Sequence, residues 1–216
     1  MVEQTRTWFY YQHVLGTALL EQPVFKNALA TGVILAEDGK KMSKKLQNYP
    51  DPMYILDTYG ADALRLYIAT SPVVQGENLN FSEKDLQTLV RNTFRMLWNS
   101  YSFFTTYATL DNWEPKKVAS APSNILDRWI LALLEELKEN MTKEMEAYQL
   151  APAARLIAPF VDDLSNWYIR RSRKRFWKNE NDADKTEAYQ TLHTVLVEVA
   201  QLMAPFAPVI AEDIYR

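Results

Sequence analysis

From Ser82 onward, apolar residues recur at every third or fourth position, which is the repeat of one face of an α-helix. Ser82, with Asp85 three residues later, is typical of a helix start. Pro159 lies inside a later apolar stripe and predicts a kink or a restart there. We therefore expect residues 82–216 to form a helical bundle, in which the clearest apolar stripe is Leu126, Trp129, Ile130, Leu133, Leu134, Leu137, Met141, Met145 and Tyr148.

The N-terminal part of the chain has a different pattern, since four of the five glycines lie in its first 60 residues. Residues 5–20 are expected to form a helix. The apolar runs 28–30 and 32–36 are expected to be strands, with a turn at Gly39. One or two strands do not make a stable sheet alone, so this part resembles a piece of an α/β domain.

Residues 49–81 are expected to connect these two parts. Asp51 followed by Pro52 is typical of a helix N-terminus, and Gly60 is suited to end that helix. A second short helix is expected over residues 61–70. The chain thus divides into residues 1–48, 49–81 and 82–216.

The charge of the chain is unevenly distributed around a net value of −3. Without the cations of residues 167–178, 18 basic residues would stand against 27 acidic ones, a balance of −9. Such asymmetry indicates local binding of phosphate groups, although two solvated charged surfaces would give the same pattern. The two clusters are Lys40, Lys41, Lys44 and Lys45, and Arg170, Arg171, Arg173, Lys174, Arg175 and Lys178.

The composition excludes several classes of site. The chain has no cysteine, which rules out disulfides, thiolate metal sites and a cysteine nucleophile, and its two histidines make a multi-histidine metal site unexpected. We expect no bound metal. No apolar run approaches the ~20 residues that span a bilayer, and the N-terminus lacks an apolar signal core. We therefore expect a cytoplasmic protein with no membrane partner.

Several isolated polar residues are assigned structural roles. Asp62 and Arg65 have the spacing of an ion pair on one helix. Asp51 is a helix cap, and His13 and His193 are assigned to packing or to the surface. The absence of a Gly-x-Gly-x-x-Gly run argues against a dehydrogenase-like nucleotide site.

The lysine-rich loop, Lys40 to Lys45, follows an expected strand and precedes an expected helix. Clustered ammonium groups on a flexible loop can reach several phosphate oxygens at once. They can also follow negative charge that moves during a reaction. Lysine-rich surface loops are common, so composition alone leaves this role open.

The sequence around this loop resembles a known family. Lys41-Met42-Ser43-Lys44-Lys45 resembles the Lys-Met-Ser-Lys-Ser signature of class I aminoacyl-tRNA synthetases, with Lys45 in place of the final serine. Valyl-, leucyl- and methionyl-tRNA synthetases share the architecture, but the Asn-Trp-Tyr-Ile-Arg-Arg run favours the isoleucyl type. Further runs, which extend the resemblance over essentially the whole chain, are Glu3-Gln4-Thr5-Arg6, Trp8-Phe9-Tyr10, Leu35 to Lys44, Asn48-Tyr49-Pro50-Asp51-Pro52, Tyr59-Gly60-Ala61-Asp62-Ala63-Leu64-Arg65 and Asp162 to Arg171.

The resemblance implies a role for each part. The fold class is then mainly α, with a truncated helical anticodon-binding bundle over residues 82–216. The bundle follows a partial α/β, Rossmann-like remnant of the catalytic domain over residues 1–48 and a stem-contact or connector region over residues 49–81.

The resemblance also implies that the loop binds ATP while the amino acid is activated. Lys44 would contact the phosphates, with Lys41 assisting, because negative charge builds on the leaving pyrophosphate. Met42 and Ser43 would belong to the same ATP site mainly by shaping the loop. The implied cofactor is ATP, with Mg²⁺ in the parent enzyme, and no cofactor is expected to be needed for folding.

The basic run of residues 167–178 is the candidate nucleic-acid surface. On a helix, Trp167, Arg170, Arg171, Lys174 and Lys178 share one face, with Arg173 and Arg175 in the same run. Arginine forks grip phosphates and aromatic rings stack on unpaired bases, and the resemblance implies isoleucine tRNA as the partner. The alternative is that Trp167, Phe176 and Trp177 are core residues and that the arginines pair with carboxylates such as Asp162 and Asp163.

Two features of the family are missing. No His-Ile-Gly-His type signature is present, since His13 is followed directly by Val14-Leu15-Gly16 without a second histidine, and the editing domain is absent. We therefore expect a fragment that is inactive alone, whose partners include the remainder of its polypeptide. The parent would activate isoleucine and join it to its tRNA. The alternatives are a stand-alone helical tRNA-binding module, against which the lysine loop argues, and a fragment of a valyl-type synthetase.

Overall fold

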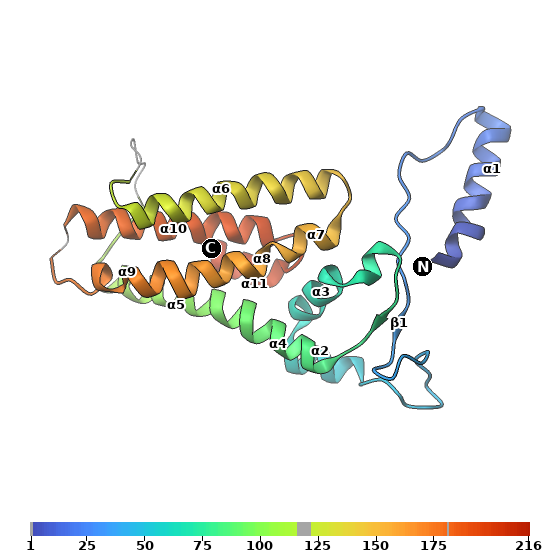
Figure 1. Cartoon of the computed structure of the whole chain (residues 1–216), viewed down its shortest axis with the longest axis horizontal. Coiled ribbons are helices and arrows are strands. Elements are labelled where there is room, and N and C mark those ends of the chain that lie inside the picture. The colour runs from blue at the N-terminus through green and yellow to red at the C-terminus, as the bar shows by residue number, and fades with distance from the viewer. Residues whose placement is uncertain (1, 116–121, 181) are drawn as a thin grey trace.

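The structure is a computed structural model that describes residues 2–115, 122–180 and 182–216. A bundle of long helices forms one side of the molecule, and a thinner N-terminal part extends from it (Figure 1). The N-terminal part contains a 3₁₀ turn, η1 (Val2–Arg6), helix α1 (Trp8–Leu20) and a short strand, β1 (Ile34–Leu35). The helix expected over residues 5–20 is therefore present from Trp8.

The expected strand over residues 28–30 is absent. Strand β1 pairs in parallel with β2 (Leu79–Asn80), with Ile34 opposite Leu79, and no strand of the described residues pairs with residues 28–30. Gly32 lies so close to the Glu77 carbonyl that a Cβ at this position would overlap it. This close approach brings the two segments together just before their pairing begins.

The connecting region contains the two short helices that the sequence predicts. These are α2 (Pro52–Tyr59) and α3 (Ala61–Thr70), followed by a 3₁₀ turn, η2 (Pro72–Gln75). The Asp51 carboxylate accepts a hydrogen bond from the Met53 N–H at 2.9 Å and so caps α2. A small apolar core joins these helices to the sheet, and its buried members are Ile55, Ala63, Tyr67, Phe81 and Leu86.

The bundle occupies the rest of the chain. Its core contains Leu97, Ile130, Leu134, Leu164 and Leu192, all of which are buried. The helices are α4 (Glu83–Leu89), α5 (Arg95–Leu110), α6 (Ile125–Glu146), α7 (Leu150–Arg155), α8 (Ile157–Asp162), α9 (Arg170–Phe176), α10 (Ala183–Met203) and α11 (Pro208–Tyr215).

Proline and glycine signals placed several of these boundaries correctly, and one expectation in this region is wrong. The chain restarts as α8 two residues before Pro159, as predicted. Tyr148, expected on the apolar stripe of α6, lies beyond the helix end with a φ of 59° and is exposed, because the chain turns there. Residues 116–121 of the expected loop lie outside the described residues.

Two π-helical segments were not predicted. They are η3 (Val90–Phe94), between α4 and α5, and η4 (Asp163–Ile169), between α8 and α9. A π segment inserts a residue into the helical turn, and a pattern that repeats every 3.6 residues does not reveal it. Segment η4 therefore resets the direction in which the side chains of α9 point.

Helix α3 is attached to the end of the bundle by hydrogen bonds to backbone groups. The Asp62 carboxylate accepts from the Ile210 N–H at 2.8 Å. The Arg65 guanidinium donates to the carbonyls of Phe206, at 3.1 Å, and Pro205, at 3.0 Å. The expected ion pair between Asp62 and Arg65 is wrong, because Asp62 binds the first turn of α11 and Arg65 binds the turn between α10 and α11.

A further contact extends this attachment. Arg155 of α7 donates a hydrogen bond of 2.7 Å to the carbonyl of Thr70, which is the last residue of α3. The guanidinium-to-carbonyl bonds are of the charge-assisted kind, which are stronger than neutral ones. The connecting region is thus fixed to the bundle at both ends of α3.

We predict that Arg65→Ala lowers the free energy of unfolding by about 1–3 kcal/mol, because two backbone carbonyls lose a charged donor. Urea denaturation followed by circular dichroism measures the change. Arg95→Ala, which removes an exposed arginine from α5, is the control and is expected to stay within about 0.5 kcal/mol. Equal losses from the two variants would contradict the attachment.

Candidate nucleotide and nucleic-acid sites

The base of the lysine loop is tied to strand β1. The Ala36 N–H donates to the Lys40 carbonyl at 2.9 Å, and Lys41 forms an antiparallel bridge with Leu35. The Gly39 N–H closes the turn on Ala36, with a φ of 77° at which glycine has no steric penalty. The loop therefore begins from a fixed backbone.

The lysines of this loop differ in how far their charge is neutralised. Lys40 pairs with Asp38 at 3.0 Å, and its N–H and ammonium hold the pKa of Asp38 below its usual range. Lys41, Lys44 and Lys45 are exposed, and no carboxylate of the described residues forms an ion pair with them. Three ammonium groups are therefore available to an anionic ligand.

Met42 and Ser43, the residues between Lys41 and Lys44, face the body of the protein. Met42 packs against the small apolar core of the connecting region. The Ser43 N–H donates to the side-chain oxygen of Asn48 at 2.8 Å. Sequence reasoning assigned no role to Asn48, although the residue lies in one of the runs that resemble the family.

A cavity of about 300 Å³ lies beside the loop. Met42 and Phe81 supply apolar walls, while Asn48, Glu37 and Glu83 supply polar groups. The hydroxyls of Tyr59 and Tyr54 both donate to Glu83, at 2.8 and 3.1 Å. The carboxylate of Glu83 raises the pKa of Tyr59 to about 12, so the tyrosine remains a neutral donor.

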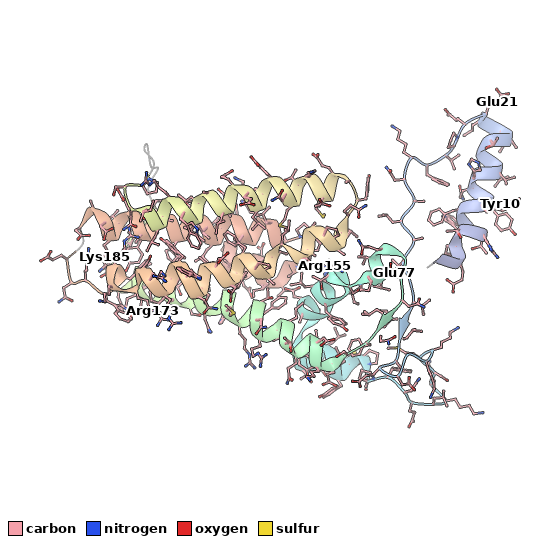
Figure 2. The ribbon with its side chains drawn as sticks, in the orientation of Figure 1. Tyr10, Glu21, Glu77, Arg155, Arg173 and Lys185 are labelled. Atoms are coloured by element: carbon pink, nitrogen blue, oxygen red, sulfur yellow. The ribbon has the colours of Figure 1, made fainter. Side chains whose placement is uncertain are left out.

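The candidate nucleic-acid surface lies on η4 and α9. Arg170, Arg171, Arg173 and Lys174 are all exposed, and Arg173 lies on the outer side of the bundle (Figure 2). No carboxylate among the described residues forms an ion pair with these four side chains. The structure therefore brings four available cations together on one short helix.

Trp167 forms an aromatic platform beside these cations. Its side chain is 48% exposed, and the Arg171 guanidinium carbon lies 3.9 Å from its ring centre. Trp129 of α6 lies next to it, with ring centres 6.4 Å apart. An exposed indole with a stacked guanidinium can offer both a flat surface and a charge to a ligand.

Arg175 corrects the expected set of contact residues. It is 7% exposed, and its guanidinium makes two bonds to the buried Asp127 carboxylate, at 2.6 and 2.7 Å. Tyr168 donates to the same carboxylate at 2.7 Å, and Arg175 also donates to the Asp184 carbonyl at 2.9 Å. Arg175 lies on the stripe that faces α6 and α10, so it belongs to the core and cannot reach a surface ligand.

The aromatic residues of the basic run divide between the core and the surface. Phe176 is buried, whereas Trp167 and Trp177 are exposed, so the expectation of a core position holds for Phe176 alone. The arginine that pairs with carboxylates does so with Asp127 and Asp184, not with Asp162 or Asp163. The sequence offers one signal for Asp127, which is an acidic residue next to Leu126 in an apolar stripe.

Lys178, expected as a contact residue, is already engaged by carboxylates. Its ammonium lies 3.0 Å from both Asp182 and Asp184, and these hydrogen bonds raise the pKa of Lys178. Asp182 also caps α10 by accepting from the Lys185 N–H at 2.7 Å. The charge that Lys178 could offer a ligand is therefore partly neutralised.

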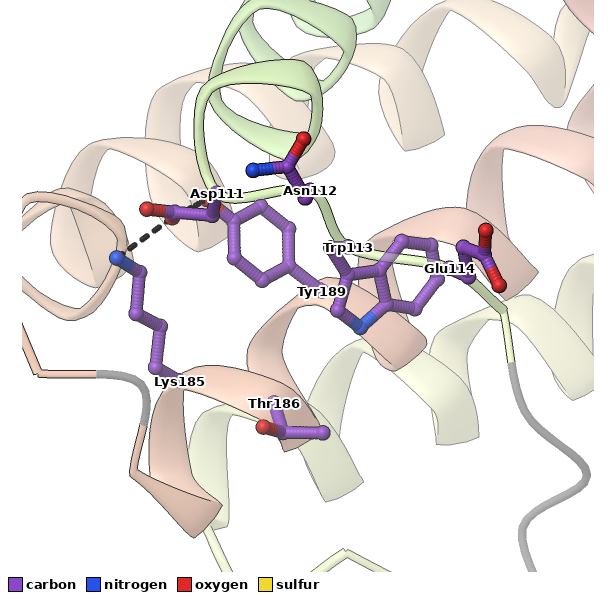
Figure 3. Close-up of a pocket in the computed structure, with 7 residues that line it drawn as sticks. All are labelled: Asp111, Asn112, Trp113, Glu114, Lys185, Thr186 and Tyr189. Carbon is purple, nitrogen blue, oxygen red and sulfur yellow. Dashed lines mark hydrogen bonds and ion pairs between the residues drawn. The ribbon is translucent and has the colours of Figure 1, made fainter.

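A second cavity, of about 260 Å³, lies at the end of the bundle remote from the connecting region. Lys185, 2% exposed, pairs with Asp111, which also accepts from the Tyr189 hydroxyl (Figure 3). Trp113 stacks on Tyr189, with ring centres 5.6 Å apart. Burial opposes the charge of Asp111, but the bonds from Lys185 and Tyr189 outweigh it and lower the pKa of Asp111. Lys185, Asp111 and Tyr189 pair their charges and hydrogen-bonding groups with one another, so we assign this cluster to holding α5 and α10 together.

The two histidines lie in different surroundings. His13 is exposed on α1. His193 lies against the rings of Phe104 and Trp113, and burial lowers its pKa.

Within residues 2–115, 122–180 and 182–216, no three potential metal ligands lie together in a way that would hold a metal ion. None of the described helices is long and apolar enough to cross a membrane.

We predict that Arg175→Met lowers the free energy of unfolding by about 3–5 kcal/mol, because it leaves the buried Asp127 charge uncompensated. Arg173→Met removes an exposed arginine from the same helix and is expected to change it by no more than about 0.5 kcal/mol. Thermal and urea unfolding of both variants measure the difference. Similar stabilities for the two would contradict the placement of Arg175 in the core.

Two parts of the chain match known protein families. Residues 2–80 match the family described as tRNA synthetases class I (I, L, M and V). Residues 127–216 match the anticodon-binding domain of tRNA ligase. The chain is 45% identical over 215 residues to an isoleucine–tRNA ligase of Protochlamydia amoebophila and 50% identical to one of Bdellovibrio bacteriovorus. These matches cover all of this chain, but only 21% and 20% of the relatives.

Solved structures with similar folds are also synthetases. A ternary complex of LeuRS, tRNA and LeuAMS from Agrobacterium radiobacter has a TM-score of 0.65 and 20% identity, over 96% of this chain and 25% of that one. A Mycobacterium tuberculosis methionyl-tRNA synthetase in complex with methionyl-adenylate has a TM-score of 0.69 and 22% identity, over 86% and 36%. At these identities the likeness shows the fold alone, and it confirms the predicted fold class.

Proposed function

We propose that the chain belongs to the class I tRNA synthetases, and that it is part of an isoleucine–tRNA ligase. The parent activates isoleucine with ATP and transfers it to its tRNA. This part supplies the Lys-Met-Ser-Lys loop and contacts to the anticodon region of the tRNA. The observation that carries the proposal is the match over the whole chain, at 45% and 50% identity, to two isoleucine–tRNA ligases. Because both are isoleucine enzymes, a valyl-type parent is the less supported alternative.

The loop is suited to bind the phosphates of ATP. When the isoleucine carboxylate attacks the α-phosphate, negative charge builds on the leaving pyrophosphate. An ammonium group that meets this charge more closely in the transition state than in the ground state lowers the barrier. Lys44 takes this role and Lys41 assists, since both are exposed and free of carboxylate partners among the described residues.

Mg²⁺ has no assigned ligand in this part of the chain. ATP carries its own phosphate oxygens as metal ligands, and no three potential metal ligands of the described residues lie together beside the loop. Lys41, Met42, Ser43 and Lys44 form the proposed nucleotide contacts.

The tRNA contact is proposed for the exposed part of η4 and α9. Trp167 offers a stacking surface, and Arg170, Arg171, Arg173 and Lys174 offer cations to phosphates. Lys178 adds a partly neutralised charge at the end of this surface. Arg175 is omitted because it is buried.

The division of the chain follows the same proposal. Residues 1–48 end the catalytic domain, residues 49–81 are the stem-contact region, and residues 82–216 are the anticodon-binding bundle. Helix α1 exposes Trp8 (61%), Leu15 (56%) and Leu19 (77%), an apolar surface that the remainder of the polypeptide would cover. A stand-alone tRNA-binding module has no use for this surface or for the lysine loop, which argues against such a module.

We predict that the chain binds isoleucine tRNA in a salt-sensitive way. With four cations on phosphates, log affinity falls with log salt at a slope of roughly −3. Arg170→Ala and Arg171→Ala each weaken binding and make the slope shallower by about 1, as measured by fluorescence anisotropy.

The control for this experiment is Lys138→Ala. It removes a cation from α6 that Glu135 and Glu198 already neutralise, so binding is expected to stay as in the parent. Valine tRNA tests how much specificity this part retains. Absence of binding by the folded chain at low salt would contradict the proposed surface.

We predict that Lys44→Ala weakens binding of inorganic pyrophosphate to the chain about three- to tenfold, because one charge contact is lost. Isothermal titration calorimetry measures the change. Lys26→Ala, which removes an exposed lysine outside the loop, is the matched control and is expected to leave binding unchanged.

The chain alone is expected to show no isoleucine-dependent exchange of pyrophosphate into ATP. Exchange by the isolated chain would contradict its assignment as a part of the enzyme.

A further inference from the structure

Asn48 holds the lysine loop by two hydrogen bonds from one side chain. Its Oδ1 accepts from the Ser43 N–H at 2.8 Å, and its Nδ2 donates to the Lys41 carbonyl at 3.2 Å. The two bonds fall on either side of Met42. A carboxamide is the one side chain of this size that accepts on one atom and donates on the other without carrying charge.

The backbone between Ser43 and Asn48 is folded so that this side chain can reach back. The Ser43 carbonyl accepts from the N–H groups of Leu46, at 3.1 Å, and Gln47, at 2.9 Å. Gln47 has a φ of 47°, in the left-handed region, which reverses the chain just before Asn48. Both backbone groups of Ser43 are therefore occupied, one by this turn and one by Asn48.

The segment that Asn48 holds is also anchored to the body of the protein. Lys41 bridges to Leu35 of β1, and the side chain of Met42 packs against the apolar core of the connecting region. Three contacts thus fix the backbone of residues 41–43 to the rest of the protein: the bridge to β1, the packing of Met42 and the hydrogen bonds of the Asn48 carboxamide. Lys41 lies at the start of this fixed segment, and Lys44 follows directly after it. Their side chains remain exposed while the backbone between them is fixed.

We propose that Asn48 is a positioning residue for phosphate binding by the lysine loop, an inference that rests on the proposed function. The carboxamide fixes the distance between the backbones of Lys41 and Ser43, and so sets where the ammonium groups of Lys41 and Lys44 can meet. Two lysines on an ordered backbone bind a polyphosphate with less loss of conformational entropy than two lysines on a loose one. Asn48 itself does not touch the ligand.

The test uses this chain, with tripolyphosphate as the probe. Asn48→Leu keeps the size and charge of the residue and removes both hydrogen bonds. Asn78→Leu is the matched control, since Asn78 also bonds to a backbone N–H, that of Val33, away from the loop. Asn48→Asp retains the acceptor for the Ser43 N–H and loses the donor to Lys41. Because its carboxylate also adds a negative charge beside the lysines, Asn48→Asp is read by amide hydrogen exchange at Ser43, which tests the bond to Ser43 separately from the bond to Lys41.

Three readouts distinguish positioning from a general loss of structure. For Asn48→Leu we expect affinity for tripolyphosphate to fall about fivefold to tenfold, as the loss of up to two hydrogen bonds implies. Amide hydrogen exchange at Ser43 rises in Asn48→Leu and stays near the parent value in Asn48→Asp. The chemical shifts of the Lys41 and Lys44 side chains, which tripolyphosphate moves together in the parent, no longer move together in Asn48→Leu. Asn78→Leu leaves all three unchanged.

The failures of the two proposals have different signatures. Binding of tripolyphosphate by the parent with unchanged affinity in Asn48→Leu overturns the role of Asn48 and leaves the loop function standing. Absence of binding by the parent, with no shift at Lys44, overturns the proposed loop function and the role of Asn48 with it.

Discussion

The buried ion pair between Asp127 and Arg175 determines how the bundle presents its surface. The Asp127 carboxylate, fully removed from solvent, receives two bonds from Arg175 and one from Tyr168, and Arg175 also binds the backbone of α10. The network therefore links α6, η4, α9 and α10. A buried charge is tolerated only when its partners are in place, so an arrangement of these helices that separated Arg175 from Asp127 would leave a buried charge unpaired. With Arg175 held inside, the remaining cations of α9 point to solvent.

The chain also shows how a weak domain remnant becomes ordered. Two strands of two residues each do not form a stable sheet, and among the residues that the structure describes, the N-terminal part packs only Ile34 and Met42 against the small apolar core of the connecting region. Its order comes from α3, which contributes to that core and is fixed to the bundle through Asp62, Arg65 and Arg155. The lysine loop, which packs on the small core through Met42, is thereby connected to the frame that carries the basic helix.

Local signals in the sequence predicted the features that depend on local chemistry. Asp51-Pro52 marked the start of α2, Pro159 the restart at α8, and the lysine signature and the basic run led to the family whose models match the chain. Features that depend on distant partners were not predictable. Arg175 and Asp127 are 48 residues apart, and nothing in the basic run distinguishes the arginine that turns inward. Asp62 and Arg65 have the spacing of an ion pair, yet they bind backbone groups 148 and 141 residues away in the sequence, those of Ile210 and Phe206 respectively. The expected strand at residues 28–30 lacked a neighbour to pair with.

The attachment of α3 to the bundle has a property that its geometry alone does not make obvious. In each of its hydrogen bonds, one of the two partners is a main-chain group: the carbonyls of Thr70, Pro205 and Phe206, and the N–H of Ile210. A main-chain group persists whatever side chain the residue carries. The turn between α10 and α11 and the first residues of α11 can therefore change their sequence during evolution while Asp62 and Arg65 stay the same. Methods that detect contacts from correlated substitutions would find no signal from these hydrogen bonds, although the bonds help to hold the two parts of the molecule together.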